Sequence, residues 1–531
     1  MDLVKTSDMS PYIDRALACL FEGVHTQAAP ISISSIPAKR EWTLEDLNLL
    51  QLSYEMLSQR VHRHIADAAQ CLNSRTSIRR LPNEIFIKVI TLALVPNDGD
   101  RKHYPWHLTS LGLVSKHWNE IIQETPSLWA QISSAYSDRE NRAAVLRSQE
   151  HPLRIHHDGR DFRGRYHEEP IFLDFVTREA YRWRSAKFDI YSSHTKALLH
   201  RFVPLSVPIL EELKIKLSQG LSSGGAIDIF SGGAACLRHI ELSYFPIHPS
   251  SQLLSGLETL KIFEWPSDCS LPSTSEITNI LRRCPNLRAF GFQLYSDRAF
   301  QVPGATPSVA EAIYLPALTS FFLNLNDPNA FRRIVSSMRI PACTSLDLSC
   351  DGPISNILAN EDSHLMSVFL SIIQAIPEIS LELYGFKFVL YNRNDNDINI
   401  TFWSGSPWED LAWLIKHTTG SVAWPPIDAT TYDSLPFSHG ADLLQKLPSI
   451  TNLTLGCDSE RYITLLSHPT LNNGIHEWVL PNLRELSLED RFHDSQQILE
   501  DLSDKRQQGA DMDRGDGVLL GLPMKLGKIR V

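Results

Sequence analysis

One short motif in the sequence has the residue types of a catalytic nucleophile. Gly220, Ser222 and Gly224 have the Gly-x-Ser-x-Gly spacing of the sharp turn that exposes a hydrolase serine. Such a turn needs a strand before it and a long helix after it, followed by an acid and a histidine. A strand is predicted at 213–217, but the residues after Gly224 are few and flanked by glycines. The motif therefore favours a loop, and an α/β hydrolase that uses Ser222 is kept only as the alternative from the enzyme class.

Other residues with chemical potential lack the partners that a site needs. His62 and His64 are two positions apart on a predicted helix, so they do not face each other, and no cysteine or carboxylate ligands accompany them in a familiar order. The stretch 521–528 has the outline of a phosphate-binding loop, but Ile529 stands where the magnesium-binding hydroxyl is needed. We therefore predict no catalytic residue, no metal and no cofactor.

The composition is that of a globular protein with an acidic balance. Its 531 residues are 43% hydrophobic and 21% charged, and 50 Lys and Arg against 61 Asp and Glu give a net charge of −11. Nucleic acid is excluded as the main partner, because phosphate binding needs a basic surface. The eight cysteines form no Cys-x-x-Cys pair, which favours a reducing compartment, the cytoplasm or the nucleus. We expect neither a secretory signal nor a membrane partner.

The N-terminal part is predicted to be an arm followed by one long helix. Residues 1–40 lack periodicity and are expected to form a loose arm, whereas 41–74 carry an amphipathic helical stripe. The stripe comprises Leu47, Leu50, Tyr54, Leu57, Val61, His64, Ala68 and Cys71. Packing against its own protein explains this helix better than a coiled-coil dimer, because the stripe is shorter than about four heptads and includes a histidine.

The segment 79–131 is predicted to contain three short helices. Pro82 and Glu84 suit the first turn of a helix, and the residues after them form a broad apolar face. Turn residues at 96–100 end this helix, and two further apolar patterns follow. So much apolar surface on about fifty residues indicates a face meant for a partner.

This segment resembles the F-box. The resemblance rests on three signatures in order: Leu81-Pro82-x-Glu84-Ile85, Leu113-Val114-Ser115-Lys116-x-Trp118 and Pro126-Ser127-Leu128-Trp129. It implies binding to the acidic Skp adaptor and, through it, to a cullin. It also implies the adaptor-binding residues Leu81, Pro82, Ile85, Phe86, Val89, Val114, Trp118, Leu128 and Trp129. The local charge agrees, since 75–116 hold seven basic residues against three acidic ones.

After residue 137 the sequence changes to a recurring strand pattern. Apolar-x-apolar pairs recur at spacings of 20 to 43 residues, with one gap of 72. The pairs are Leu153/Ile155, Phe188/Ile190, Leu213/Ile215, Ile240/Leu242, Leu260/Ile262, Phe290/Phe292, Phe321/Leu323, Leu346/Leu348, Leu381/Leu383, Leu453/Leu455, Leu486/Leu488 and Ile529/Val531. Helix-like stretches lie between them, so we expect one strand and one helix per repeat and a curved sheet of adjacent strands.

This alternation resembles a degenerate leucine-rich-repeat domain of the kind that follows the F-box in many fungal proteins. The predicted fold class is therefore α/β: an α-helical F-box at 79–131, then a curved leucine-rich-repeat-like solenoid at 137–531 with a largely parallel sheet. The gap of 72 residues predicts an irregular insertion at about 384–440, which is aromatic around 403–424. A doubly wound α/β sheet is the alternative architecture.

The two resemblances imply a non-catalytic substrate receptor of a Skp–cullin–F-box ubiquitin ligase, with an F-box scaffold outside a ligase as the alternative. The residues between the core-facing leucines of each strand point to the other face of the sheet. On that face lie Lys214, Lys216 and Lys261, and then Phe263 and Phe322. We expect an unidentified target protein to be held around both phenylalanines, with an acidic segment toward the lysines. Otherwise the aromatic insertion is the expected recognition surface.

Overall fold

The chain divides into two compact units, Met1–Thr125 and Pro126–Val531, in a computed structural model. The structure describes residues 44–75, 77–94, 104–159, 169–191, 199–217, 226–265, 271–294, 312–350, 353, 363–384, 387–392, 395–404, 407–418, 424–431, 444–455, 459–467, 470–472, 475–477, 479–488, 500–507 and 528–530. The predicted arm at 1–40 lies outside these ranges. Among the helices described, none combines the length and the apolar character needed to cross a bilayer.

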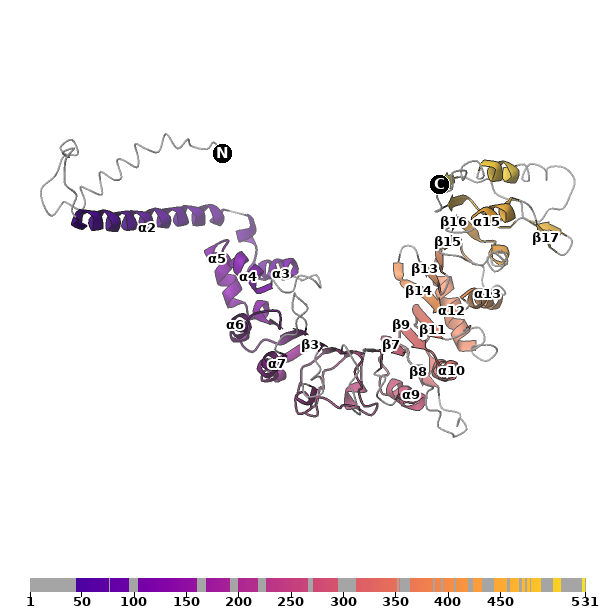
Figure 1. Cartoon of the computed structure of the whole chain (residues 1–531), viewed down its shortest axis with the longest axis horizontal. Helices are drawn as coiled ribbons and strands as arrows, with labels where there is room; N and C mark the ends of the chain where they lie inside the picture. The colour runs from indigo at the N-terminus through magenta and orange to yellow at the C-terminus, as the bar shows by residue number, and fades with distance from the viewer. Residues whose placement is uncertain are drawn as a thin grey trace. The chain divides into compact units, whose positions relative to one another are not determined.

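The first unit is helical (Figure 1). It contains α2 (Leu44–Ser74), the 3-10 turn η3 (Ser77–Arg80), α3 (Asn83–Ala93), α4 (Tyr104–Gly112) and α5 (Lys116–Glu124). One long helix followed by three short ones is the predicted order. Pro82 occupies the N-cap of α3, where its missing amide proton costs no hydrogen bond, and Glu84 lies in the first turn.

The apolar stripe of α2 faces solvent over the part that the structure describes. Tyr54 and Val61 are 71% and 46% exposed, and His64 and Ala68 of the same stripe are exposed as well. The structure therefore does not support the expected packing of this helix against its own protein. The sequence pattern correctly indicated the helix, because periodicity reports which residues share a face, but it does not report what covers that face.

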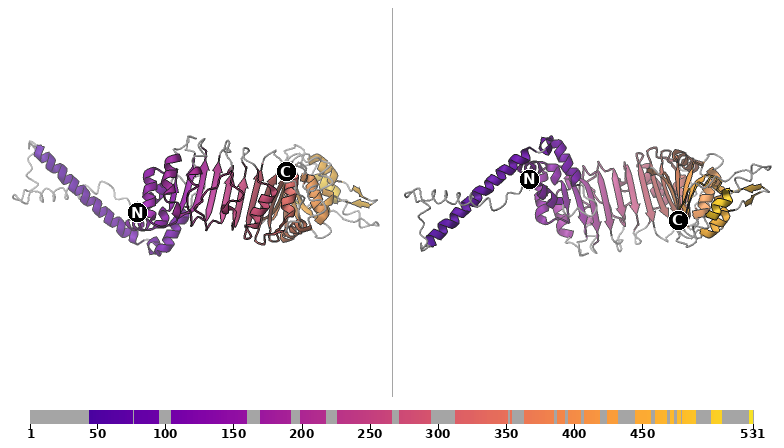
Figure 2. Two further views of the ribbon diagram at one scale, coloured as in Figure 1. Left: turned by 90° about the horizontal axis from the view of Figure 1, so that it is seen from below. Right: turned by 90° about the horizontal axis from the view of Figure 1, so that it is seen from above.

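The second unit is built on one large sheet whose strands lie side by side (Figure 2). In spatial order its 16 strands are β1 (Gln131–Ser133), β2 (Leu153–Asp158), β3 (Trp183–Ile190), β4 (Glu212–Leu217), β5 (His239–Ser243), β6 (Thr259–Phe263), β7 (Ala289–Leu294), β9 (Ser320–Leu325), β11 (Ser345–Cys350), β14 (Asp395–Trp403), β13 (Lys387–Asn392), β12 (Ile379–Leu383), β15 (Ile427–Thr431), β16 (Ile450–Leu455), β19 (Glu485–Leu488) and β20 (Lys528–Arg530). Two small sheets pair β8 (Ile313–Tyr314) with β10 (Met338–Arg339), and β17 (Thr470–Asn472) with β18 (Ile475–Glu477).

Helices and 3-10 turns connect many of these strands. They are η5 (Pro126–Trp129), α6 (Asp138–Ser148), α7 (Glu169–Thr177), η6 (Ala180–Arg182), η7 (Gln252–Leu254), α9 (Thr274–Arg282), α10 (Pro328–Ser336), α12 (Ser363–Ala375), α13 (Pro407–Thr418) and α15 (Ser459–Leu466). Figure 1 shows α9, α10, α12 and α13 along the same side of the strands. Capping boxes begin α6 and α9, where Ser137 and Ser273 pair with a glutamate three residues later.

The strands pair in the register that the sequence predicts. Leu260 lies opposite Phe290, Phe290 opposite Phe321, and Phe321 opposite Leu346 in parallel pairs. Each of the other predicted pairs through Leu486/Leu488 also falls within a strand, and Ile529 lies in β20. The expectation of one large, mostly parallel sheet is therefore confirmed.

The two faces of the sheet differ in burial. Along β6, Leu260 and Ile262 are buried, whereas Thr259, Lys261 and Phe263 are half-buried, and β5 and β11 alternate in the same phase. The buried face packs against the helices, and we call the opposite side the open face. Such alternation is what a sheet covered on one side requires.

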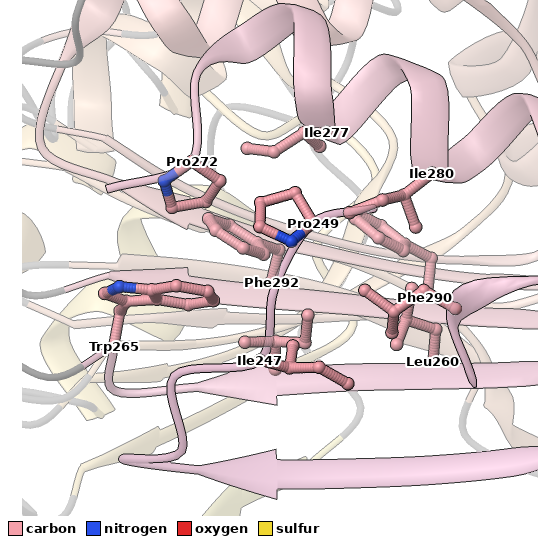
Figure 3. Close-up of a pocket in the computed structure, with 11 residues that line it drawn as sticks. Ile247, Pro249, Leu260, Trp265, Pro272, Ile277, Ile280, Phe290 and Phe292 are labelled. Atoms are coloured by element: carbon pink, nitrogen blue, oxygen red, sulfur yellow. The ribbon is translucent and has the colours of Figure 1, made fainter. Parts of the chain in front are cut away.

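The core beneath α9 is tightly packed (Figure 3). Ile277 and Ile280 of α9 point toward Phe290 and Phe292 of β7, and Trp265 closes one side. The space left among them is about 10 Å³. That volume holds no more than about one water molecule, so this gap is not a ligand site.

The segment predicted as an irregular insertion at 384–440 contains regular structure. Strands β13 and β14, helix α13 and strand β15 all fall within it. Strand β13 is antiparallel to both β12 and β14, while β14 pairs in parallel with β11 and β15 with β12. The main sheet therefore continues through this segment, with a three-stranded antiparallel part in an otherwise parallel ladder.

Two adjacent phenylalanines on opposite faces test this arrangement. Phe321 is 1% exposed and stacks on Phe290, so Phe321→Ala should lower the free energy of unfolding by about 3–5 kcal/mol, because it removes a buried ring and leaves a cavity. Phe322→Ala, on the open face, is the matched control and should cost less than about 1.5 kcal/mol. Urea unfolding followed by circular dichroism measures both. Equal losses would contradict the assignment of the two faces.

Candidate functional site

The first candidate site is an apolar face on and beside α3. Leu81, Ile85, Val89 and Leu92 are 36%, 48%, 43% and 64% exposed. They are spaced by three or four residues, so they lie on one side of the helix. We call these four residues the α3 apolar face. Apolar side chains gathered in this way on a soluble domain mark a surface that a partner covers.

The inner side of α3 fixes the orientation of this face. Phe86 and Ile90 are buried, and the ring of Phe86 meets the edge of Trp118 at a centroid distance of 4.7 Å. Trp118 is held at the start of α5, where the Ser115 side chain caps the helix by accepting a hydrogen bond from the Trp118 amide at 3.2 Å. Burial of Phe86 therefore ties α3 to α5 and leaves the α3 apolar face outward.

The structure sorts the predicted adaptor-binding residues into two groups. Exposed or half-buried are Leu81, Pro82, Ile85, Val89, Val114 and Trp118, whereas Phe86, Leu128 and Trp129 are buried. Within the second unit, the Arg147 guanidinium covers the Trp129 ring at 4.4 Å. Contact with an adaptor thus stays a prediction for the first group, and the three buried residues support the fold.

A hollow of about 590 Å³ lies in the first unit beside Val114. Ala66 and Ala69 of α2 and Ile78 provide apolar walls, and Arg79 lies at the same hollow. The only charges in its lining besides Arg79 are Lys116 and Glu120, which pair at 3.8 Å. Its local balance is therefore basic, as the sequence composition of this region indicated.

The second candidate site lies on the open face of the sheet. Strand register places one residue from each of seven adjacent strands in a row: Lys261, Gly291, Phe322, Asp347, Thr401, Val389 and Glu382. Together with Phe263 and Tyr391, this row lines a hollow of about 690 Å³. We call it the open-face hollow.

Gly291 makes room near one end of this row. A methyl group added there would lie 3.3 Å from Cγ of Lys261 and 3.6 Å from the Phe263 ring. Because Gly291 has no side chain, the Phe263 ring reaches over β7, and its centroid lies 5.8 Å from that of Phe322 in an edge-to-face arrangement. Two aromatic rings therefore stand at one side of the hollow without covering it.

Asp347 is the unusual charge in the open-face hollow. Its Oδ1 is buried and has no hydrogen-bond partner among the residues that the structure describes. Burial raises the pKa of this carboxyl to about 6, although a hydrogen bond with Trp403 and the charge of Lys387 act in the opposite direction. The carboxylate form is thus held at a free-energy cost near neutral pH.

The other carboxylate of the hollow is well compensated. Glu382 accepts hydrogen bonds from the hydroxyls of Tyr384 and Tyr391 at 2.8 and 2.9 Å. The Lys387 ammonium lies 4.4 Å from the Tyr384 ring centroid and 4.5 Å from that of Trp403. Hydrogen bonds thus hold Glu382 in place, whereas Oδ1 of Asp347 has no hydrogen-bond partner among the described residues.

The predicted target-binding residues also fall into two groups. Lys261, Phe263 and Phe322 line the open-face hollow, but Lys214 and Lys216 do not. Lys214 forms ion pairs with Glu212 at 3.2 Å and Glu241 at 3.5 Å. Burial alone would lower the pKa of Lys214, but these two carboxylates raise it overall. The positive charge of Lys214 is therefore already paired with carboxylates within the sheet.

Sequence reasoning missed the residues that close the hollow on its far side. Val389, Thr401 and Glu382 come from β13, β14 and β12, and two of these strands lie in the supposed insertion. A signal was present, because Phe388/Leu390 and Ile400/Phe402 are also apolar-x-apolar pairs. These pairs do not show that β14, and not β12, is the strand beside β11.

The signals weighed for other chemistry gain no support. Gly220, Ser222 and Gly224 lie outside the residues that the structure describes. Over the described part of the chain, no three His, Cys, Asp or Glu side chains are grouped as a metal site requires. His62 and His64 are both exposed on α2.

Asp347→Asn should stabilise the protein at neutral pH. The folded-state pKa of about 6 lies above the ordinary value of 3.8, so the folded state holds the proton more tightly, and wild-type stability falls as the pH rises through this window. The variant should therefore gain up to about 3 kcal/mol over the wild type at pH 7.5, and the gain should vanish near pH 4. Urea unfolding at several pH values measures it. A gain that does not change with pH would refute the assignment.

Comparison with known proteins bears on the first site. Residues 78–135, which include the α3 apolar face and the caps that orient it, match the F-box-like family. No curated protein sequence matches the chain significantly. The matched range agrees with the predicted F-box at 79–131. This protein therefore carries an F-box-like domain at residues 78–135.

Proposed function

We propose that this chain is the substrate-recognition subunit of a Skp–cullin–F-box ubiquitin ligase, acting in the cytoplasm or the nucleus. The F-box-like domain binds the Skp adaptor, and the adaptor joins the chain to a cullin. The second unit, a leucine-rich-repeat-like solenoid, holds a target protein. The chain supplies position, because holding two reactants together lowers the barrier without a catalytic residue of its own.

The observation that carries this proposal is the α3 apolar face inside the F-box-like domain. F-box domains typically bind the Skp adaptor, and Leu81, Ile85 and Val89 are exposed side chains within the residues that match the F-box-like family. Buried aliphatic and aromatic anchors dominate the energy of most protein interfaces. Arg79, which lines the hollow beside Val114, would attract an acidic adaptor.

The open-face hollow supports the assignment of target binding to the second unit. It has two aromatic rings, charged groups of both signs and a volume of about 690 Å³. Concave sites with apolar walls and a few polar groups are typical binding sites. Among the described residues the helices lie along the other face of the sheet, and no described helix covers the open face.

The adaptor assignment predicts a loss of binding without a loss of fold. Leu81→Ala combined with Pro82→Ala should reduce co-purification with the Skp adaptor at least about tenfold, because it truncates anchors at one end of the α3 apolar face. Leu146→Ala, which alters a residue 80% exposed on α6, is the control and should bind as the wild type does. Circular dichroism checks that both variants are folded. Undiminished adaptor binding by the double variant would refute the proposal.

The assignment of target binding to the open-face hollow predicts a variant that loses its targets and keeps the adaptor. Phe263→Ala with Phe322→Ala should lose captured target proteins while adaptor binding persists, because both rings line the open-face hollow. Tyr314→Ala, which removes an aromatic side chain 63% exposed outside this hollow, is the control. Affinity purification with quantitative mass spectrometry compares the variants. If the double variant keeps its full set of targets, recognition lies elsewhere in the chain.

A further inference from the structure

We infer that the open-face hollow binds an arginine side chain of the target, with the guanidinium at Asp347 and the alkyl stem against Phe322. This inference rests on the proposed function for the source of the arginine, and it names the chemistry of that site.

The first step of the argument is the unpaired oxygen of Asp347. Oδ1 is buried and has no hydrogen-bond partner in the described part of the chain. Trp403 supplies a hydrogen bond to this carboxyl, and Lys387 supplies a positive charge nearby, but the Lys387 ammonium also lies over two aromatic rings. Because Asp347 also lines the hollow, a cationic group placed there would compensate the charge of this partly buried carboxylate. Polar groups kept at a cost to stability are typical of functional sites.

The second step is the position of the aromatic rings relative to this carboxyl. Phe322 is directly opposite Asp347 on the adjacent strand, so the two side chains are about 5 Å apart across the ladder. The ring of Phe263 meets Phe322 edge to face. Arginine combines a stem that packs on a ring with a planar fork that donates to a carboxylate. Lysine has no such fork, and a neutral side chain leaves the carboxylate uncompensated.

The third step is the distribution of the other charges. Lys261 and Glu382 are each three strands away from Asp347, on opposite sides. At about 4.8 Å per strand this is about 14 Å, beyond the screening length of about 8 Å at physiological salt. Neither charge therefore dominates the field at Asp347. The carboxylate of Asp347 would repel an acidic target segment. Lys214 would attract such a segment only weakly, because it already forms ion pairs within the sheet.

Selection from a random peptide library displayed on phage tests the inference with the full chain. Peptides that bind the wild type but not Asp347→Asn should be enriched in arginine. A selected peptide should then lose at least about tenfold in affinity when its arginine is replaced by citrulline, which keeps the shape but removes the charge. Asp189→Asn is the matched control, because Asp189 lies on the same face with a raised pKa but pairs with Lys187 at 3.6 Å outside the hollow.

The pH dependence of peptide binding supplies a second readout. Protonation of Asp347 removes its charge, so affinity for the wild type should fall as the pH drops below about 6. Lys387, Lys261 and Glu382 are the other charged groups to consider here, and Asp347→Asn isolates the contribution of Asp347 from theirs. Enrichment of acidic peptides, of lysine in place of arginine, or of no cationic residue would overturn the inference.

The inference and the proposed function fail separately. If the adaptor binds but no arginine peptide is selected, the ligase assignment stands and the inference is wrong. If arginine peptides bind at Asp347 but the adaptor does not bind, the site is real and the ligase assignment is wrong. Asp347→Asn is expected to be at least as stable as the wild type, so unfolding does not confuse the result.

Discussion

The parallel, in-register pairing of successive strands is the constraint on which the second unit depends. Because Leu260, Phe290 and Phe321 lie opposite one another, each strand presents its apolar residues to the same side. A slip of one residue would turn those side chains to solvent and bury the lysines between them. The hydrophobic core therefore sets the register of the strands. The register in turn decides which residues lie on the open face, although those residues do not pack in the core.

The open face becomes a site only where the ladder departs from its simplest form. Strand β13 runs antiparallel between β14 and β12, and it brings Val389 opposite Thr401 and Glu382. Gly291 leaves space at the other side of the same row. The open-face hollow thus has walls from strands whose order in the sheet differs from their order in the chain. Antiparallel strands within a parallel sheet are tolerated because each still pairs all its backbone groups.

Two features of this protein lower the stability of its folded state when no partner is bound. The α3 apolar face leaves four large side chains in water, and in the described part of the chain a buried oxygen of Asp347 has no hydrogen-bond partner. Each carries a free-energy cost that the rest of its unit must offset, through the Phe86–Trp118 contact in the first case and the tightly packed core of the sheet in the second. Binding of a partner would offset both free-energy costs, because association covers apolar surface and pairs charges.

Local sequence patterns were sufficient to predict most strands of the large sheet, the three short helices of the F-box-like domain and the face on which each strand residue lies. These properties depend on local periodicity and capping, which neighbouring residues carry. Only the tertiary structure decided that Lys261, Phe263 and Phe322 share a hollow with Asp347 and Glu382 while Lys214 does not. It also decided that Phe86, Leu128 and Trp129 are buried while Ile85 and Val114 are exposed. The physical reason is that these outcomes depend on which strand or helix is the neighbour, and pairing between distant segments leaves no local pattern.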